Sequence, residues 1–306
     1  MDYTKFGSRE MRLAILKFLR FVPDNLMIRL QYKIATGNWL NLKEPKRYTE
    51  KLQWYKLFYR NPLMVQCADK FDVREYVTRC GLGDILTKCY GVFDSPEEID
   101  FSSLPEKFVA KDTLGGGGTS VLIVRDKCKA DLSEIKNQMR RWVNEPQGVK
   151  TGGREWPYYS GKKHRIVIEE YIETEAIQGL TDYKFFCFDG RFEYMYLICD
   201  RELGQQVKLG IFDKTWNKLE AYRTDEKPLK GEFWLPEQIN EMVEIAEKLS
   251  KEFPHARVDL YNENGKILFG EITFFDGSGY MKFEPDEFDF VMGEKFKLPE
   301  KSGRKK

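Results

Sequence analysis

The chain has 306 residues, of which 42% are hydrophobic and 14% aromatic, so it is long enough for two or three lobes and too apolar for a disordered protein. Its 50 Lys and Arg nearly balance its 49 Asp and Glu, which argues against a nucleic-acid partner and requires any anion site to be local. Six cysteines without a CxxC pair and only two histidines exclude the usual spacing of a zinc site.

The N-terminal part of the chain has the pattern of helices. Apolar residues recur at helical spacing in 9–20, 24–35, 49–59 and 68–79. Residues 9–20 are also basic, and such a pattern packs on a neighbouring helix more often than it binds a membrane surface. We favour packing and keep weak membrane-surface association as the alternative.

No leader peptide is recognisable, and no run approaches the roughly 20 apolar residues of a membrane span. We therefore expect a cytoplasmic location, with peripheral association at the inner face of the cell membrane as the alternative.

Short runs typical of strands begin after Gly81. They are rich in β-branched and aromatic residues and occupy 85–93, 107–111 and 120–124. A helix is expected at about 131–143. The following Gly-, Lys- and Tyr-rich stretch, 147–163, lacks periodicity and is expected to be a mobile loop.

The C-terminal half predicts a second sheet that opens with a strand at 165–172. Strands at 183–188 and 191–198 flank Asp189-Gly190, and those at 256–261 and 266–275 flank Asn264-Gly265. Both dipeptides favour type I′ turns and therefore hairpins. A helix is expected at 236–252.

A lysine and four glycines form the first chemical motif. Lys111 ends a strand, and Gly115, Gly116, Gly117, Gly118 and Thr119 lead into the next one. A turn without Cβ atoms lets backbone N–H groups converge on an anion, and Lys111 adds a positive charge. The motif therefore predicts a phosphate site, with a merely flexible hairpin loop as the alternative. It is neither a P-loop nor a dinucleotide-binding turn.

Two acids and an arginine form the second motif. Arg257 and Asp259 share one face of a strand, and Glu271 and Thr273 share one face of its expected hairpin partner. Neighbouring carboxylates repel unless a cation lies between them, and Mg²⁺ prefers oxygen ligands. The motif therefore predicts a Mg²⁺ site, with a solvated outer face of alternating charge as the alternative.

The order of these motifs resembles the ATP-grasp superfamily, in particular the TupA-like branch found with teichuronopeptide, capsule and O-antigen genes. The resemblance extends from about residue 30 to 299 and rests on the stretches ADKFDVREYV, IEEYI, DYKFFCFDG, IAEKLS, RVDLY and FGEITF.

This resemblance implies an α+β fold in which two α+β lobes grip ATP after a helical N-terminal region. The expected parts are a helical region leading into the first strand, a lobe with the glycine-rich phosphate loop, a C-terminal lobe with the metal site, and a disordered basic tail; they span 1–95, 96–168, 169–299 and 300–306.

The resemblance also implies roles for individual residues. Lys70, Lys111 and the glycine loop would contact ATP phosphates, and Arg257 would stabilise a developing oxyanion. Adenine and ribose would be held by the segment with Glu169, Glu170, Tyr171, Ile172 and Glu175. The Mg²⁺ ligands would be Asp259, Glu271 and Thr273, although Thr273 stands where an Asn is common. Asp182, Lys184 and Arg201 would face phosphates or acceptor, and Gly277, Ser278 and Gly279 would receive substrate. For Arg74 we favour ordinary surface charge.

The reaction implied by the resemblance is an ATP- and Mg²⁺-dependent joining of a carboxylate to an amine through an acyl phosphate. The acceptor would be a small molecule or glycan, such as a sugar acid or amino acid of a surface polysaccharide. A glycosyltransferase, a kinase acting on a sugar hydroxyl, and a binding protein without turnover remain alternatives.

Overall fold

The computed structural model describes residues 15–16, 18–116, 120–174, 179–199, 207–231 and 233–301. Within these ranges, no helix combines the length and the apolar character that crossing a membrane requires. Most of the helix predicted at 9–20 lies outside the described residues, and its end forms the 3₁₀ turn η2 (Leu19–Phe21). Residues 302–306 of the predicted tail also lie outside them.

The N-terminal helices are α2 (Asp24–Thr36), α3 (Tyr48–Phe58), α4 (Pro62–Ala68) and α5 (Val73–Arg79). The first two confirm the helices predicted at 24–35 and 49–59. The single helix predicted at 68–79 is wrong in its first turn. There the Asp69 side chain accepts the N–H groups of Phe71 and Asp72, both at 2.9 Å, and holds a turn between α4 and α5.

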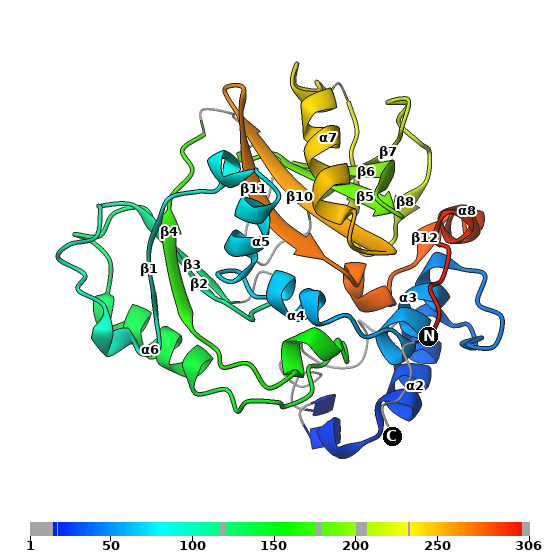
Figure 1. Cartoon of the computed structure of the whole chain (residues 1–306), viewed down its shortest axis with the longest axis horizontal. Helices are drawn as coiled ribbons and strands as arrows, with labels where there is room; N and C mark the ends of the chain where they lie inside the picture. The colour runs from blue at the N-terminus through cyan, green and yellow to red at the C-terminus, as the bar shows by residue number, and fades with distance from the viewer. Residues whose placement is uncertain are drawn as a thin grey trace.

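The smaller sheet contains four antiparallel strands in the order β1-β4-β2-β3. Helix α6 (Leu132–Val143) packs against this sheet through Ile135, Met139 and Trp142, which recur at helical spacing (Figure 1). The first strand of this sheet lies before residue 96, in the part of the chain expected to lead from the helices into the first strand. Its strands are β1 (Cys89–Phe93), β2 (Phe108–Asp112), β3 (Val121–Val124) and β4 (Ile166–Glu170).

The larger sheet has the order β11-β10-β5-β6-β7-β9, antiparallel except between β7 and β9. Both hairpins form as predicted, because Asp189, Gly190, Asn264 and Gly265 all take the positive φ that type I′ turns need. The strands are β5 (Asp182–Phe188), β6 (Arg191–Cys199), β7 (Lys208–Asp213), β9 (Lys227–Pro228), β10 (His255–Glu263) and β11 (Lys266–Thr273).

Helix α7 (Ile239–Ser250) packs on β10, β5 and β6 of this sheet (Figure 1). The sequence patterns did not predict α8 (Glu287–Lys295), which packs against α3, or the two-stranded pair of β8 (Tyr222–Arg223) and β12 (Phe283–Glu284). These elements are short or carry no clear apolar stripe, so periodicity does not reveal them.

Part of the stretch 147–163, predicted to be a mobile loop, packs against the N-terminal segment. It contains the 3₁₀ turn η5 (Trp156–Tyr159), and its Arg154 is 2% exposed. The Arg154 guanidinium donates to Asp24 Oδ1 at 3.0 Å and to the Leu19 carbonyl at 2.7 Å. Tertiary contacts with the N-terminal segment therefore order a stretch that has no periodicity of its own.

Candidate active site

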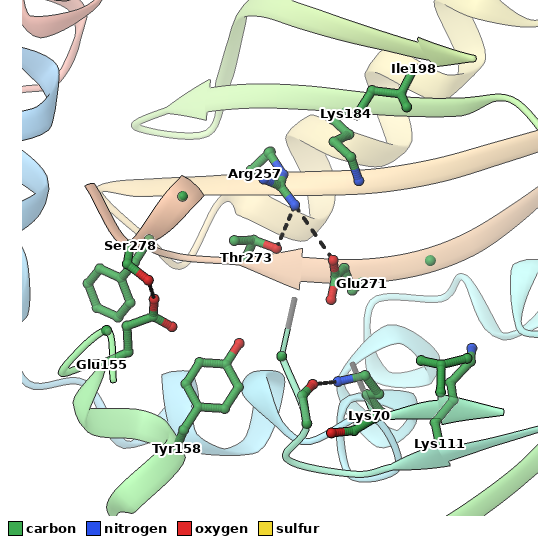
Figure 2. A pocket seen from close by; sticks show the side chains of 18 of the residues that line it. Lys70, Lys111, Glu155, Tyr158, Lys184, Ile198, Arg257, Glu271, Thr273 and Ser278 are labelled. Atoms are coloured by element: carbon green, nitrogen blue, oxygen red, sulfur yellow. Dashed lines mark hydrogen bonds and ion pairs between the residues drawn. The ribbon is translucent and has the colours of Figure 1, made fainter. Parts of the chain in front are cut away.

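A cavity of about 720 Å³ lies between the two sheets and receives side chains from both (Figure 2). Clefts of this size, walled by charged and apolar groups, are typical of small-molecule sites. The predicted site residues that line it are Lys70, Lys111, Gly115, Gly116, Glu169, Lys184, Arg257, Glu271, Thr273, Gly277 and Ser278.

Lys70 and the first glycines form one end of the cavity. The Lys70 ammonium donates to the Gly115 carbonyl, and burial lowers the pKa of Lys70. A Cβ on Gly115 would collide with the Ser120 side chain, so only glycine fits this turn. A bound anion would offset the burial cost of the Lys70 charge.

Lys111 and Arg74 share the carboxylate of Glu169. Lys111 Nζ lies 2.6 Å from Glu169 Oε2, and Arg74 Nη1 lies 3.2 Å from Oε1. Burial disfavours the charge on Glu169, but Lys111 and Arg74 outweigh it and lower the pKa of this acid. The interpretation of Arg74 as surface charge is therefore wrong, because its side chain lines the cavity and pairs with a buried acid.

Arg257 is the centre of the opposite wall. Its Nε and Nη2 donate to the two oxygens of Asp259 at 2.7 Å each, and Nη2 also donates to Thr273 Oγ1 at 3.0 Å. Glu271 Oε1 lies 3.6 Å from Arg257 Nη2 (Figure 2). The predicted pairing is confirmed, since Arg257 faces Thr273 and Asp259 faces Glu271 across the hairpin.

Lys184 lies between two buried acids on neighbouring strands. Its ammonium is 2.8 Å from Asp182 Oδ2 and also pairs with Asp259. Burial raises the pKa of Asp259 to about 6, and Asp182 adds to this effect while Arg257 and Lys184 oppose it. A further cation nearby would therefore lower this pKa and favour the ionised form of Asp259.

The residues predicted as metal ligands provide suitable oxygen donors. Glu271 has a side chain that is 41% exposed and extends toward the cavity (Figure 2). Mg²⁺ is usually held by one or two carboxylates together with substrate phosphates, and Glu271 offers such a carboxylate at the cavity, whereas both oxygens of the buried Asp259 accept from Arg257. Among the described residues, one group of three potential ligand side chains has its ligand atoms close together, and it lies away from this site, at Glu106, Asp126 and Cys128.

Gly277 and Ser278 form a tight turn with φ of 49° and 52°. The Ser278 hydroxyl donates to Glu155, and Gln53 Nε2 donates to the Ser278 and Gly279 carbonyls at 3.0 and 2.6 Å. The turn is thus held in the cavity wall from two sides.

Several predicted residues lie away from the cavity. Glu170 accepts the Lys88 N–H at 2.9 Å, and the Tyr171 ring lies 5.9 Å from Lys107 Nζ. Among the described residues, Asp182, Asp259, Glu170, Tyr171, Ile172 and Gly279 do not line the cavity directly. The predictions for Gly117, Gly118, Thr119, Glu175 and Arg201 lie outside the described residues.

The sequence reasoning missed further residues that line the cavity, among them Glu155, Tyr158, Tyr196 and Arg223. It also missed Asp276, which is 1% exposed, accepts from Arg257 and lies 3.4 Å from Arg223. Asp276 directly precedes the predicted Gly277 turn, and that position was the available signal. Glu155 and Tyr158 fall in a stretch without periodicity, so no local pattern identifies them.

The family model described as TupA-like ATPgrasp matches residues 50–297. The chain belongs to the TupA-like ATP-grasp family. The predicted α+β ATP-grasp fold is therefore confirmed, and the cavity between the two sheets is the candidate active site of this family member.

Solved structures of two ligases and a synthetase show a distant similarity to this chain. D-alanine–D-alanine ligase from Bacillus anthracis is 20% identical with a TM-score of 0.44, over 68% of this chain and 57% of that one. L-amino acid ligase from Bacillus licheniformis is 15% identical with a TM-score of 0.43, over 78% and 49%. N5-carboxyaminoimidazole synthetase from Staphylococcus aureus, complexed with ADP, is 13% identical with a TM-score of 0.40, over 82% and 56%. No curated protein matches this chain.

Proposed function

We propose that this protein is an ATP- and Mg²⁺-dependent carboxylate–amine ligase that acts through an acyl phosphate. The observation that carries the proposal is the convergence of cations from both walls on one cavity. Lys70 and Lys111 come from one wall, and Lys184 and Arg257 come from the other (Figure 2). Such an arrangement suits a polyphosphate bound between the lobes.

The substrate class proposed for this enzyme is a sugar acid or amino acid of surface-polysaccharide biosynthesis. Family membership supports this proposal through the capsule and O-antigen setting of the TupA-like branch. Lys70 and Lys111 bind the phosphates, and Glu169 orients Lys111 through its 2.6 Å ion pair. Glu271, with Asp259 beside it, would hold Mg²⁺, which would supply charge neutralisation of the transferred phosphoryl group.

Arg257 binds the activated carboxyl group. Asp259 and Asp276 hold its guanidinium in place, so its remaining donor capacity faces the cavity without rearrangement during the reaction. A permanently charged donor fork is suited to the oxyanion that forms when an amine attacks an acyl phosphate. Positioning and charge neutralisation carry this chemistry, and no nucleophilic side chain is required.

The product nucleotide separates this function from the alternatives. A ligase releases ADP and phosphate, a kinase releases ADP and a phosphorylated acceptor, and a glycosyltransferase releases UDP or GDP. The paired acids Asp259 and Glu271 lie on separate strands of one hairpin, which favours the nucleoside triphosphate reactions over a sugar-nucleotide motif.

The test combines ligand-induced stability with product analysis. Melting temperature is measured with ATP, ADP, UDP-glucose and GDP-mannose, each with and without Mg²⁺, in wild type, Glu271→Ala and the control Glu263→Ala at the other end of the hairpin. A ligand at a hundredfold excess over its Kd adds about 2.7 kcal/mol of stability. We expect Mg²⁺-dependent stabilisation by ATP that Glu271→Ala removes and Glu263→Ala retains. ADP release is then measured with a panel of uronic acids and amino acids. Stabilisation by a sugar nucleotide and not by ATP would refute the proposal.

A further inference from the structure

The loop of residues 151–160, here called the Glu155 loop, walls the cavity at the end away from the lysines. Figure 2 shows Lys70 and Lys111 at one end, and Glu155, Tyr158 and Ser278 at the other. The two ends therefore offer different chemistry. One presents ammonium groups, and the other presents a carboxylate and hydroxyl groups.

Buried charges hold the Glu155 loop against the Gly277 turn. Lys56 is 1% exposed, and its ammonium donates to the Gly153 and Ser278 carbonyls at 2.8 Å each. Burial lowers the pKa of Lys56 to about 7, so its charged form is costly here. Lys56 thus joins two segments of the cavity wall and fixes their relative position.

Gly153 permits the contact between the Glu155 loop and the turn. A Cβ at this position would collide with Ser278 Oγ and would lie 2.9 Å from Glu155 Oε1. The hydrogen bond from Ser278 to Glu155 therefore depends on a glycine next to it.

Glu155 and Tyr158 retain unused hydrogen-bonding capacity toward the cavity. Ser278 occupies one carboxylate oxygen of Glu155, and the other oxygen points toward Tyr158 (Figure 2). No Lys or Arg side chain in the described ranges lies within ion-pair distance of the Glu155 carboxylate. The Tyr158 side chain lines the cavity, and its hydroxyl extends into it (Figure 2).

We propose that Glu155 and Tyr158 bind the amine substrate as its ammonium ion and that Glu155 takes the proton this amine must lose. The inference rests on the proposed ligase function and assigns its second substrate. A cation is complementary to this end of the cavity, where the carboxylates of Glu155 and Glu271 face the same space. Burial, opposed by Lys56, raises the pKa of Glu155 and makes it a better proton acceptor.

The proposed step balances in atoms and charge. One proton passes from the ammonium nitrogen to Glu155, which leaves a neutral amine with a free electron pair. A bond forms between this nitrogen and the carbonyl carbon of the acyl phosphate, and the bond from that carbon to the phosphate oxygen breaks. The phosphate leaves with the electron pair and takes the second nitrogen proton, and Glu155 returns its proton to solvent.

Two kinds of nucleophile distinguish a defect in the amine site from a defect in the first half-reaction, the formation of the acyl phosphate. A carboxylate that supports ADP release is supplied with hydroxylamine, which is uncharged at neutral pH and traps acyl phosphates as hydroxamates. In parallel it is supplied with cationic probes: ethanolamine, alanine and lysine. In Glu155→Gln we expect hydroxamate formation within about twofold of wild type. Amide formation should fall roughly 100-fold, with a higher KM for the amine.

Glu145→Gln is the matched control, because Glu145 precedes the loop and pairs with Arg20 outside the cavity. It should leave both products unchanged, and thermal unfolding checks that each variant is folded. Equal loss of hydroxamate and amide in Glu155→Gln would overturn the inference while leaving the ligase function intact. So would a wild type that makes hydroxamate but no amide with any probe. Absence of ADP release with every carboxylate would instead refute the proposed function.

Discussion

Arg257 and Asp259 lie two residues apart on β10 and share two hydrogen bonds of 2.7 Å, from Nε and Nη2 of the guanidinium to both carboxylate oxygens. Alternation along a strand puts the two side chains on one face, and the neighbouring strands close them in. The fork geometry of arginine is essential to this contact, because lysine has a single donor centre.

Arg257→Lys is therefore expected to lower the rate of ADP release by about 10²–10³. The charge remains, but the two-point contact with Asp259 and the bond to Asp276 cannot both form. Carboxylate-dependent ADP release measures the effect, and Arg191→Lys, at an exposed strand end, is the control. Unchanged turnover in Arg257→Lys would contradict the proposed role.

Lys111→Ala is expected to weaken ATP binding by roughly 10- to 100-fold, the value of one or two charge-assisted hydrogen bonds. It also leaves Glu169 with Arg74 as its ion-pair partner in the described chain. Titration calorimetry with Mg·ATP gives the Kd. Lys107→Ala, on the segment entering β2, removes a lysine whose side chain is 46% exposed and should have no effect. Equal affinities of the two variants would exclude Lys111 from the phosphate site.

His164 should make stability depend on pH through its ion pair with Asp112. Burial disfavours the imidazolium, but Asp112, at 2.9 Å, outweighs it and raises the pKa of His164 above 6.5. The stabilisation is thus fully present below pH 6.5 and is lost as the pH rises through the folded-state pKa.

Urea unfolding of wild type and His164→Gln between about pH 5 and pH 9 measures this dependence. The stability advantage of the wild type should shrink with rising pH, by about 1.4 kcal/mol for each unit of pKa elevation. A difference that grows with pH would contradict the predicted sign.

The N-terminal segment exposes a group of large apolar side chains, defined as Ile15, Phe18, Phe21, Leu26 and Leu30, each at least 50% exposed. Basic residues surround it in sequence, so weak association with an anionic membrane surface, the alternative to helix packing, is the proposal tested here. Phe18→Ser with Phe21→Ser should reduce sedimentation with vesicles containing phosphatidylglycerol several-fold. Trp234→Ser, at 82% exposure elsewhere, is the control. Equal binding to neutral vesicles, or a concentration-dependent dimer lost in the variant, would count against the proposal.

Local patterns predicted the parts of the fold that are locally determined. Helices α2 and α3 follow apolar spacing, and both hairpins follow their Asp-Gly and Asn-Gly turns. The pairing of Asp259 with Glu271 does not follow from the turn alone: the register of the two-residue loop would place Asp259 opposite Gly270, and the register shift between Asp259 and Leu260 brings Glu271 opposite it instead. Arg74 and Asp276 were not predicted as site residues, since an isolated charge carries no periodic signal.

The sequence by itself determined the ATP-grasp family, the two hairpin turns and which residues share one face of a strand, because turns and alternation act over a few residues. The tertiary structure decided what lies opposite. It brought Lys111 of the small sheet and Arg257 of the large one to a single cavity, and it placed the Glu155 loop against the Ser278 turn, more than a hundred residues away. Those juxtapositions depend on how two lobes and an N-terminal helical segment pack, which no local pattern encodes.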